Sequence, residues 1–146
     1  MSTVKHRLMH TGNALGVSLY RRSGGRIGGH GAGGVRVLLL TVPGRRTGLP
    51  RTTAVGYFDY QGGYLVVGSG GGMSQEPDWF RNTRKASRAE VQVGPQTLPV
   101  AIRVLTGPER DTAFRDVVVA QVPQFGKYEG KSGRSMPLAL LTPLTG

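Results

Sequence analysis

The chain has 146 residues, which is the length of a single domain with its own hydrophobic core. Its formal net charge is +11, from 19 Lys+Arg against 8 Asp+Glu. This excess predicts attraction to nucleic acid, to anionic lipid, or to a phosphorylated or carboxylated ligand. The chain contains no cysteine, which excludes disulfides, thiolate metal sites and cysteine nucleophiles.

Residues 4–22 are expected to form a short basic helix, because Leu8, Leu15 and Leu19 share one face and glycines follow at 24–25. Such a helix either docks on the domain or lies on an anionic membrane, and its narrow apolar face favours docking. The N-terminus lacks the apolar core of a signal peptide, and no apolar run is long enough to cross a bilayer. We therefore expect a cytoplasmic protein, with peripheral membrane contact through this helix left open.

A glycine-rich loop, "GGRIGGHGAGG", follows at residues 24–34. Its "GHGAGG" matches the dinucleotide-binding pattern G-x-G-x-x-G, but here a helix precedes it and a strand follows, which is the reverse of the order that the motif needs. We interpret the match as chance. Residues 1–34 are expected to form an N-terminal helix and loop, and residues 35–146 a single cofactor-binding domain.

The rest of the chain is a series of short apolar runs separated by turns. Strands are expected at residues 35–42, 51–60, 64–69, 89–94, 97–106 and 136–141, and helices at residues 77–86 and 106–122. The second of these helices begins with Thr106 and Glu109 at capping-box spacing, and residues 123–135 are expected to be a loop. About six mostly antiparallel strands with flanking helices indicate an α+β fold that is mainly β, closed into a small barrel.

Three arginines lie in the turn between the first two strands, "PGRRTGLPR". Glycines at positions 44 and 48 permit a tight backbone, and prolines at 43 and 50 stiffen it. Arg45, Arg46 and Arg51 repel each other unless an anion lies among them, and guanidinium groups suit phosphate and carboxylate. The alternative is a solvated hairpin tip, and we favour the anion site.

Two further segments could line a site. The strand end "VVGSGGG", residues 66–72, leaves bare backbone N–H groups to which a planar ring or a phosphate could come close; a merely flexible loop is the alternative. In "PDWFRNTRK", Trp79 and Phe80 are adjacent and face different directions, so one could pack inward while the other borders a pocket. Core packing of both aromatic rings is the simpler interpretation, and Asn82 begins a polar side.

Residues for hydrolytic or metal chemistry are scarce. His6 and His10 are spaced like a helical metal pair, but they lack an acidic third ligand, and His30 stands apart. The eight carboxylates are scattered, so paired general acid–base catalysis has no support. We expect no metal site, and an enzyme only if a cofactor carries the chemistry.

The segments "LLLTVPGRRTGLPRTTAVGYF", "GGYLVVGSGGG", "EPDWFRNTRK" and "AEVQVG", in this order, resemble the deazaflavin-dependent nitroreductase family. Its members are small split β-barrels that bind coenzyme F420. The resemblance implies that the cofactor tail binds to Arg45, Arg46, Thr47 and Arg51, near Trp79 and Asn82. It places the deazaflavin ring beside Ala54, Val55, Tyr57, Val67, Gly68, Ser69 and Gly70. Tyr128 is the implied substrate-pocket tyrosine.

Two positions depart from the family pattern. Gly70 stands where relatives often carry lysine, which removes one cationic contact to the cofactor, and Ala54 stands where many have proline. The implied function is hydride transfer from the reduced cofactor to a quinone, an activated alkene or a nitro compound. In that reaction Tyr128 either orients or protonates the substrate, or only closes the pocket by packing.

Three rivals stay open at this point: an FMN-binding split barrel, a deazaflavin-binding protein without turnover, and a nucleic-acid binder. The last is disfavoured because the arginines cluster in a turn and not along an aromatic strand face. The physiological substrate and the choice between a monomer and a homodimer do not follow from the sequence.

Overall fold

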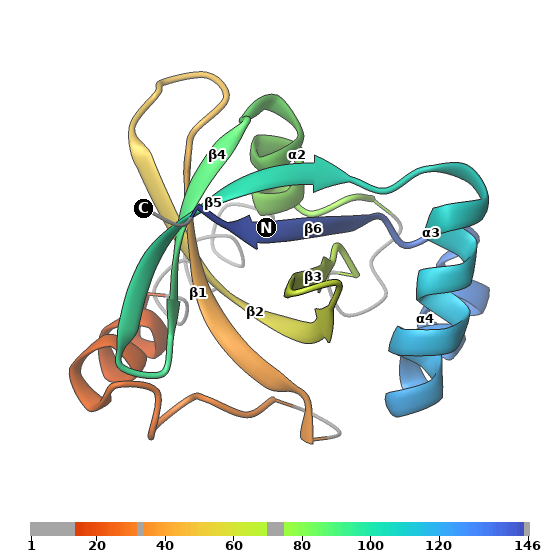
Figure 1. Ribbon diagram of the computed structural model, residues 1–146, viewed down its shortest axis with the longest axis horizontal. Helices are drawn as coiled ribbons and strands as arrows, with labels where there is room; N and C mark the ends of the chain where they lie inside the picture. The colour runs from red at the N-terminus through yellow and green to blue at the C-terminus, as the bar shows by residue number, and fades with distance from the viewer. Residues whose placement is uncertain (1–13, 32–33, 70–74, 145–146) are drawn as a thin grey trace, which may run out of the picture.

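The computed structural model describes residues 14–31, 34–69 and 75–144. Within them, six strands occur: β1 (Arg36–Pro43), β2 (Pro50–Tyr60), β3 (Gly63–Val67), β4 (Arg88–Val93), β5 (Gln96–Val104) and β6 (Leu138–Pro143). Neighbouring strands are all antiparallel in the order β1-β2-β3-β6-β5-β4, and β4 pairs with β1 to close a barrel (Figure 1). The expected mainly β, six-stranded barrel with flanking helices is confirmed.

Alternation along the strands fills the interior of the barrel. In β1, for example, Leu38 and Leu40 belong to the interior cluster, whereas Leu39 packs on the outside. Every strand contributes to this cluster, and Phe80 of α2 (Asp78–Lys85) is fully buried in it. The Phe80 ring thereby anchors helix α2 in the barrel.

Helices cover the outer faces of the barrel. Helix α3 (Gly107–Ala113) continues as a π-helical segment, Phe114–Val119, and α4 (Gln124–Ser132) follows. Figure 1 shows α3 and α4 next to each other beside the barrel. They bury a second apolar cluster against the outward side chains of β2, β3 and β6. A separate helix, residues 14–23, packs on β1 at Leu39.

The expected loop at residues 123–135 is wrong over most of its length, because α4 occupies it. Three glycines made this segment look irregular. Phe125 and Tyr128, one turn apart, nevertheless pack on the second cluster, and the Phe125 ring meets Phe58 edge to face at 6.0 Å. Burial of these rings outweighs the low helix propensity of glycine, and Gly133 ends the helix in the left-handed conformation.

Two finer expectations are also wrong. Thr106 makes no side-chain cap hydrogen bond on α3, and Glu109 instead pairs with Arg103 of β5 at 2.6 Å. The helix at 14–23 does dock, as favoured, but through Val17 and Tyr20, while the side chains of Leu15 and Leu19 are exposed. Its expected N-terminal part, with Leu8, His6 and His10, lies outside the described residues.

Candidate functional site

The turn between β1 and β2 is a closed loop of backbone hydrogen bonds. Gly44 donates to the Leu49 carbonyl and Gly48 donates to the Gly44 carbonyl, each at 2.8 Å. Gly48 has φ +74°, which favours glycine, and Thr47 Oγ1 accepts a bond from Leu49 N–H at 3.2 Å. The turn therefore presents its arginine side chains from a fixed backbone.

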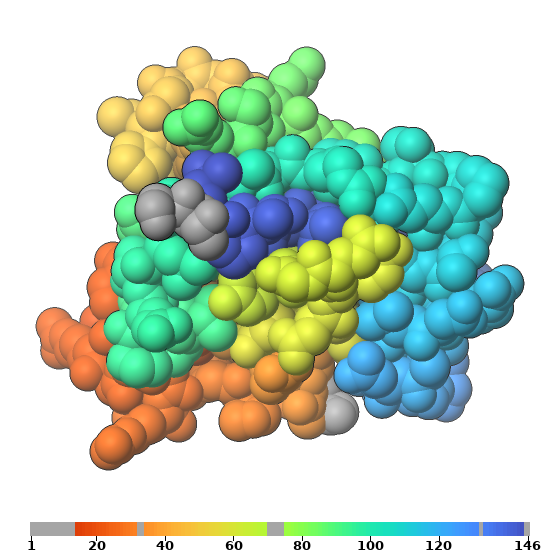
Figure 2. Space-filling view, in the orientation of Figure 1, coloured from red at the N-terminus to blue at the C-terminus, as the bar shows by residue number. Residues whose placement is uncertain are grey.

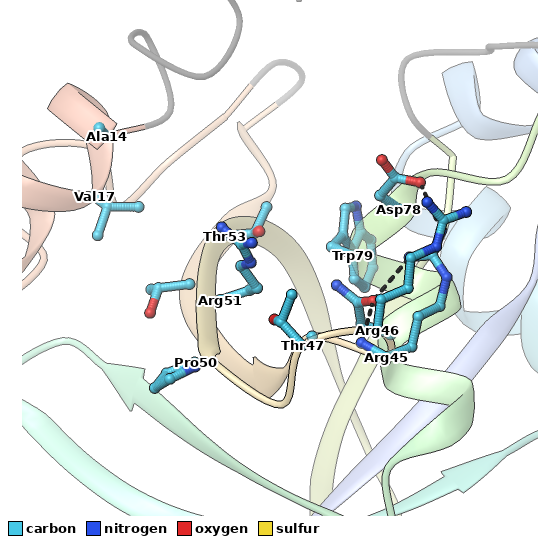
Figure 3. A pocket seen from close by; sticks show the side chains of 13 residues that line it. Ala14, Val17, Arg45, Arg46, Thr47, Pro50, Arg51, Thr53, Asp78 and Trp79 are labelled. Carbon is cyan, nitrogen blue, oxygen red and sulfur yellow. Dashed lines mark hydrogen bonds and ion pairs between the residues drawn. The ribbon is translucent and has the colours of Figure 1, made fainter.

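A cleft of about 510 Å³ lies beside this turn (Figure 3). The turn and the first residues of β2 form its floor with Arg45, Arg46, Thr47, Arg51, Thr52 and Thr53. Helix α2 supplies Asp78, Trp79 and Asn82, and the helix at 14–23 supplies Ala14 and Val17 on the opposite side. Figure 2 shows the turn and the α2 region side by side at one end of the molecule.

Arg45 joins the turn to α2. Its backbone N–H donates to Asn82 Oδ1 at 3.1 Å, its Nη1 donates to the same oxygen at 2.8 Å, and its Nη2 meets Asp78 Oδ1 at 3.3 Å. The Arg45 side chain is 21% exposed and Asn82 is buried. A partly shielded charge with three contacts of this kind is held in one position.

Arg46 and Arg51 differ from Arg45. Both are exposed, and neither guanidinium forms a hydrogen bond or ion pair with another residue in the described part of the chain. They therefore retain their donors for a ligand, and with threonine hydroxyls beside them the donor set suits a phosphate and several carboxylates. The residues present fit the acidic tail of a deazaflavin cofactor.

The two aromatic residues of α2 both pack on the barrel cluster, as the simpler interpretation expected, but only Trp79 also borders the cleft. Phe80 is buried in the barrel, whereas Trp79 is half-buried and borders the cleft. Their rings meet edge to face at 5.4 Å. The indole thus has a fixed back and one face toward the cleft.

The strand residues that the sequence assigned to the ring are arranged differently. Ala54 is exposed on β2, but Val55 and Tyr57 point into the barrel. Burial raises the pKa of the Tyr57 phenol, and the Arg36 guanidinium, 4.9 Å from the ring centroid, opposes that shift. Val67 packs in the cluster under α3 and α4.

Gly68 and Ser69 follow β3 and do not line the cleft. A Cβ on Gly68 would lie 2.7 Å from Pro137 Cγ and 2.8 Å from Phe80 Cδ2, and the Gly68 N–H donates to the Pro137 carbonyl at 2.8 Å. Gly68 is therefore a glycine because the tight packing leaves no space for a side chain. The sequence suggested a bare N–H at this position, but the Pro137 carbonyl accepts it. Gly70 lies outside the described residues.

Tyr128 lies on α4, away from the arginine cleft. It is half-buried, its ring meets Phe125 edge to face at 5.8 Å, and Gln124 donates to its hydroxyl at 3.2 Å. The structure thus brings together the proposed tail residues, and it does not bring Tyr128 to them.

Sequence reasoning missed several residues of this region. Asp78 is one helical turn from Asn82, and this spacing could have revealed it as the partner of Arg45. Arg134 donates from Nη2 to the carbonyls of Gly68 and Ser69 at 3.2 and 3.1 Å. Nothing in the local pattern around Arg134 indicated that contact.

The described residues contain neither a metal cluster nor a membrane-spanning helix. Among them, no three His, Asp or Glu side chains gather where they could hold a metal ion. None of the helices in the described part of the chain is long and apolar enough to cross a membrane.

Several known proteins are similar to this chain in sequence and in fold. A model of the family described as F420H(2)-dependent quinone reductase matches residues 14–143. The F420H(2)-dependent quinone reductase Rv1261c of Mycobacterium tuberculosis is 31% identical over 127 residues, which cover 86% of this chain and 85% of that protein.

Two solved structures are similar at 28% identity. That of an F420-H2 dependent reductase, FDR-A, has a TM-score of 0.64 and covers 72% of this chain and 92% of the other. One described as a domain-swapped dimer also has a TM-score of 0.64 and covers 72% and 78%. The resemblance to deazaflavin-dependent reductases is confirmed, and with it an oxidoreductase that uses coenzyme F420. The chain belongs to the F420H(2)-dependent quinone reductase family.

Proposed function

We propose that this protein reduces a quinone-class acceptor with reduced coenzyme F420. The observation that carries the proposal is the cleft beside the β1–β2 turn, in which Arg46 and Arg51 have no partner among the described residues. When bound, reduced F420 supplies the hydride. The protein supplies an anion site, orientation and shelter from water.

We assign the acidic tail of the cofactor to Arg46 and Arg51, with Thr47 as a hydroxyl donor. Arg45 is held by Asn82 and Asp78, so its main role is to fix the turn against α2 and to add charge to the cleft. Trp79 offers a flat apolar wall beside the tail. The family lysine that Gly70 replaces would have added one further cation.

The ring position is proposed from the strand pairing. Residues 50–57 of β2 pair with β1, and residues 57–60 pair with β3. The part of β2 between the turn and Tyr57, which includes Ala54, thus lies between the arginine cleft and the strand end at Gly68 and Ser69. A ring placed along this edge would extend from a tail bound at Arg51, which supports the assignment.

Tyr128 is proposed to border the acceptor. Reduction of a quinone to a quinol adds a proton as well as a hydride, and a phenol can orient the acceptor or donate that proton. Tyr128→Phe keeps the ring that packs on Phe125 but lacks the hydroxyl. We expect kcat to fall by about 10-fold or more with the melting temperature unchanged. A kcat equal to that of the wild type would leave Tyr128 with packing alone.

The test of the function is a titration of the protein with F420 and with FMN, followed by mixing of the reduced complex with menaquinone. We expect saturable binding of F420 and prompt oxidation of its reduced form by the quinone. Binding of FMN alone would overturn the proposal. Binding of F420 without oxidation by quinone, alkene or nitro acceptors would favour a non-catalytic carrier.

We also propose that the helix at 14–23 contacts anionic membrane, where a lipophilic quinone would be found. Its outer face exposes Leu15 (62%) and Leu19 (39%), and Ile27 just beyond it is 53% exposed. Arg21, Arg22 and Arg26 are exposed nearby. Exposed apolar side chains among cations are what an interfacial helix needs.

A further inference from the structure

The connection between α4 and β6, residues 133–137, contacts the end of the barrel strand β3 and also the helical layer outside the barrel. It starts at Gly133, which ends α4 with φ 71°, and it contains Met136, which is fully buried. Its polar contacts lead to the end of β3 on one side and to α3 and α4 on the other.

The first set of contacts fixes the end of β3. Arg134 Nη2 donates to the carbonyls of Gly68 and Ser69, at 3.2 and 3.1 Å, while the Pro137 carbonyl accepts the Gly68 N–H at 2.8 Å. The Pro137 ring fills the space next to the Gly68 Cα. The connection thus binds both the N–H and the carbonyl of Gly68 and also packs against its Cα.

The second set of contacts fixes the same connection to the helices. Met136 N–H donates to Glu129 Oε2 at 3.0 Å, and Arg110 donates to the Met136 carbonyl from Nε at 3.1 Å and from Nη2 at 2.8 Å. Arg110 also pairs with Glu129, and its side chain is only 12% exposed. Backbone and charge therefore link the connection to the helix that carries Tyr128.

We infer that Arg134 is a positioning residue for hydride transfer, which holds the Gly68–Ser69 strand end in place relative to α4. This inference rests on the proposed function, in which the strand end borders the cofactor ring and α4 borders the acceptor. Arg134 sets the distance between the strand end and α4. Its backbone is part of the connection that follows α4, and its side chain is hydrogen-bonded to the strand end.

The chemistry explains why arginine suits this position. A terminal guanidinium nitrogen carries two N–H groups in one plane, so a single Nη2 can donate to two carbonyls, whereas lysine offers a compact and strongly hydrated ammonium. Donation to the Gly68 carbonyl also polarises the peptide that it shares with the Ser69 N–H, which makes that N–H a stronger donor toward the ring.

The test compares Arg134→Ala, Arg134→Lys and the control Arg115→Ala, whose side chain is 71% exposed and pairs with the adjacent Asp116. Amide hydrogen exchange of Gly68 is measured first, without cofactor. The absorption spectrum and the dissociation constant of bound F420 are measured next, followed by kcat and KM for menaquinone. We expect faster Gly68 exchange, an altered spectrum and a kcat about 10- to 100-fold lower in Arg134→Ala. The F420 dissociation constant should change less than about 3-fold, because Arg46 and Arg51 are intact.

Arg134→Lys should recover part of kcat, and it substitutes for the alanine variant if that does not fold. If Gly68 exchanges faster in the variants while kcat and the spectrum stay as in the wild type, the role of Arg134 is purely structural and the inference is overturned. Unchanged Gly68 exchange would also overturn it, because Arg134 would then not hold the strand end. If the wild type itself leaves the F420 spectrum unchanged, the proposed function fails and the inference fails with it. If the wild type binds F420 and reduces the quinone, and the Arg134 variants keep wild-type kcat and spectrum, the inference alone fails.

Discussion

The three arginines of the β1–β2 turn have the same side chain and different surroundings. Arg45 is bound to Asn82 and Asp78, whereas Arg46 and Arg51 have no partner in the described part of the chain. The bound arginine holds the backbone of the turn, and we propose that the two others bind the ligand. An anion that binds between Arg46 and Arg51 relieves their repulsion and forms charge-assisted hydrogen bonds.

Charge reversal separates these roles. Arg46→Glu and Arg51→Glu are each expected to raise the F420 dissociation constant about 10- to 100-fold, since a hydrogen bond to a charged group is worth about 1.5–3 kcal/mol. The melting temperature should change little, because exposed charges add little to folding. Arg115→Glu makes the same change in net charge far from the cleft and should bind F420 as the wild type does. Equal loss in all three variants would point to long-range charge and not to a site.

A second residue-scale consequence concerns Gly68, which has no space for a side chain. Gly68→Ala puts a methyl group within 2.8 Å of both Pro137 and Phe80. Overpacking of this kind is expected to lower the free energy of unfolding by about 1–3 kcal/mol. On α4, a Cβ at Gly130 would meet nothing within 4 Å, so Gly130→Ala should instead raise it by about 0.5–1 kcal/mol. Urea unfolding of both variants measures the two free energies of unfolding. A Gly68→Ala protein as stable as the wild type would show that Phe80 and Pro137 move aside.

At the scale of elements, the helix at 14–23 packs on the barrel and is also hydrogen-bonded to it through the Tyr20 phenol. Tyr20 is 1% exposed, and its hydroxyl donates to the Gln92 carbonyl at 3.2 Å and accepts the Gly94 N–H at 2.9 Å. Burial raises the pKa of this phenol, with the bond from Gly94 opposing the shift. Because Ala14 and Val17 line the arginine cleft, the phenol also fixes one wall of the site. The division of the chain at residue 34 stays a prediction.

Tyr20→Phe keeps the ring and removes both hydrogen bonds. We expect a free energy of unfolding lower by about 1–2 kcal/mol, faster amide exchange in residues 14–23, and weaker F420 binding through the loosened wall. Tyr60→Phe is the matched control, since the Tyr60 hydroxyl makes only an exposed bond with Gln61. Unchanged F420 affinity in a Tyr20→Phe protein whose helix exchanges faster would exclude the wall from binding.

Hydrophobic alternation and turn chemistry were sufficient to predict the barrel from the sequence. The β2–β3 hairpin is an example: Gly62, with φ 75°, supplies the left-handed conformation that a tight hairpin turn needs. Contacts between distant residues were not predictable in the same way. Helix α4 depends on the Phe58–Phe125 contact, and the position of Gly68 depends on Arg134, 66 residues away. The arginine turn was readable because its three cations lie within seven consecutive residues.

At the scale of the whole molecule, the positive charge is unevenly distributed. Residues 1–58 carry 9 Lys+Arg and no Asp or Glu, whereas residues 59–146 carry 10 Lys+Arg and 8 Asp+Glu; the two parts contribute +9 and +2 of the net +11. The charged part includes the helix at 14–23 and the arginine turn. One end of the chain thus attracts both an acidic cofactor and, as we propose, an anionic surface.

Vesicle flotation tests the proposed surface contact. We expect the protein to float with vesicles that contain phosphatidylglycerol and not with pure phosphatidylcholine, and salt at about 0.5 M to weaken the binding, by screening over about 10 Å or less. Leu15→Gln with Leu19→Gln should reduce flotation and leave F420 binding intact. Equal flotation of this double variant would remove the helix from the proposed contact.

The tail cleft and the helical layer that carries Tyr128 come from separate parts of the chain. The cleft is built from residues between 14 and 82, and the layer from residues between 107 and 132. Under the proposed function, substitutions in the layer change which acceptor is reduced while the cleft keeps the same donor. A family built in this way can diversify its acceptors under selection while it stays committed to one cofactor, and exchange of residues 107–132 between relatives is the natural unit for such a change.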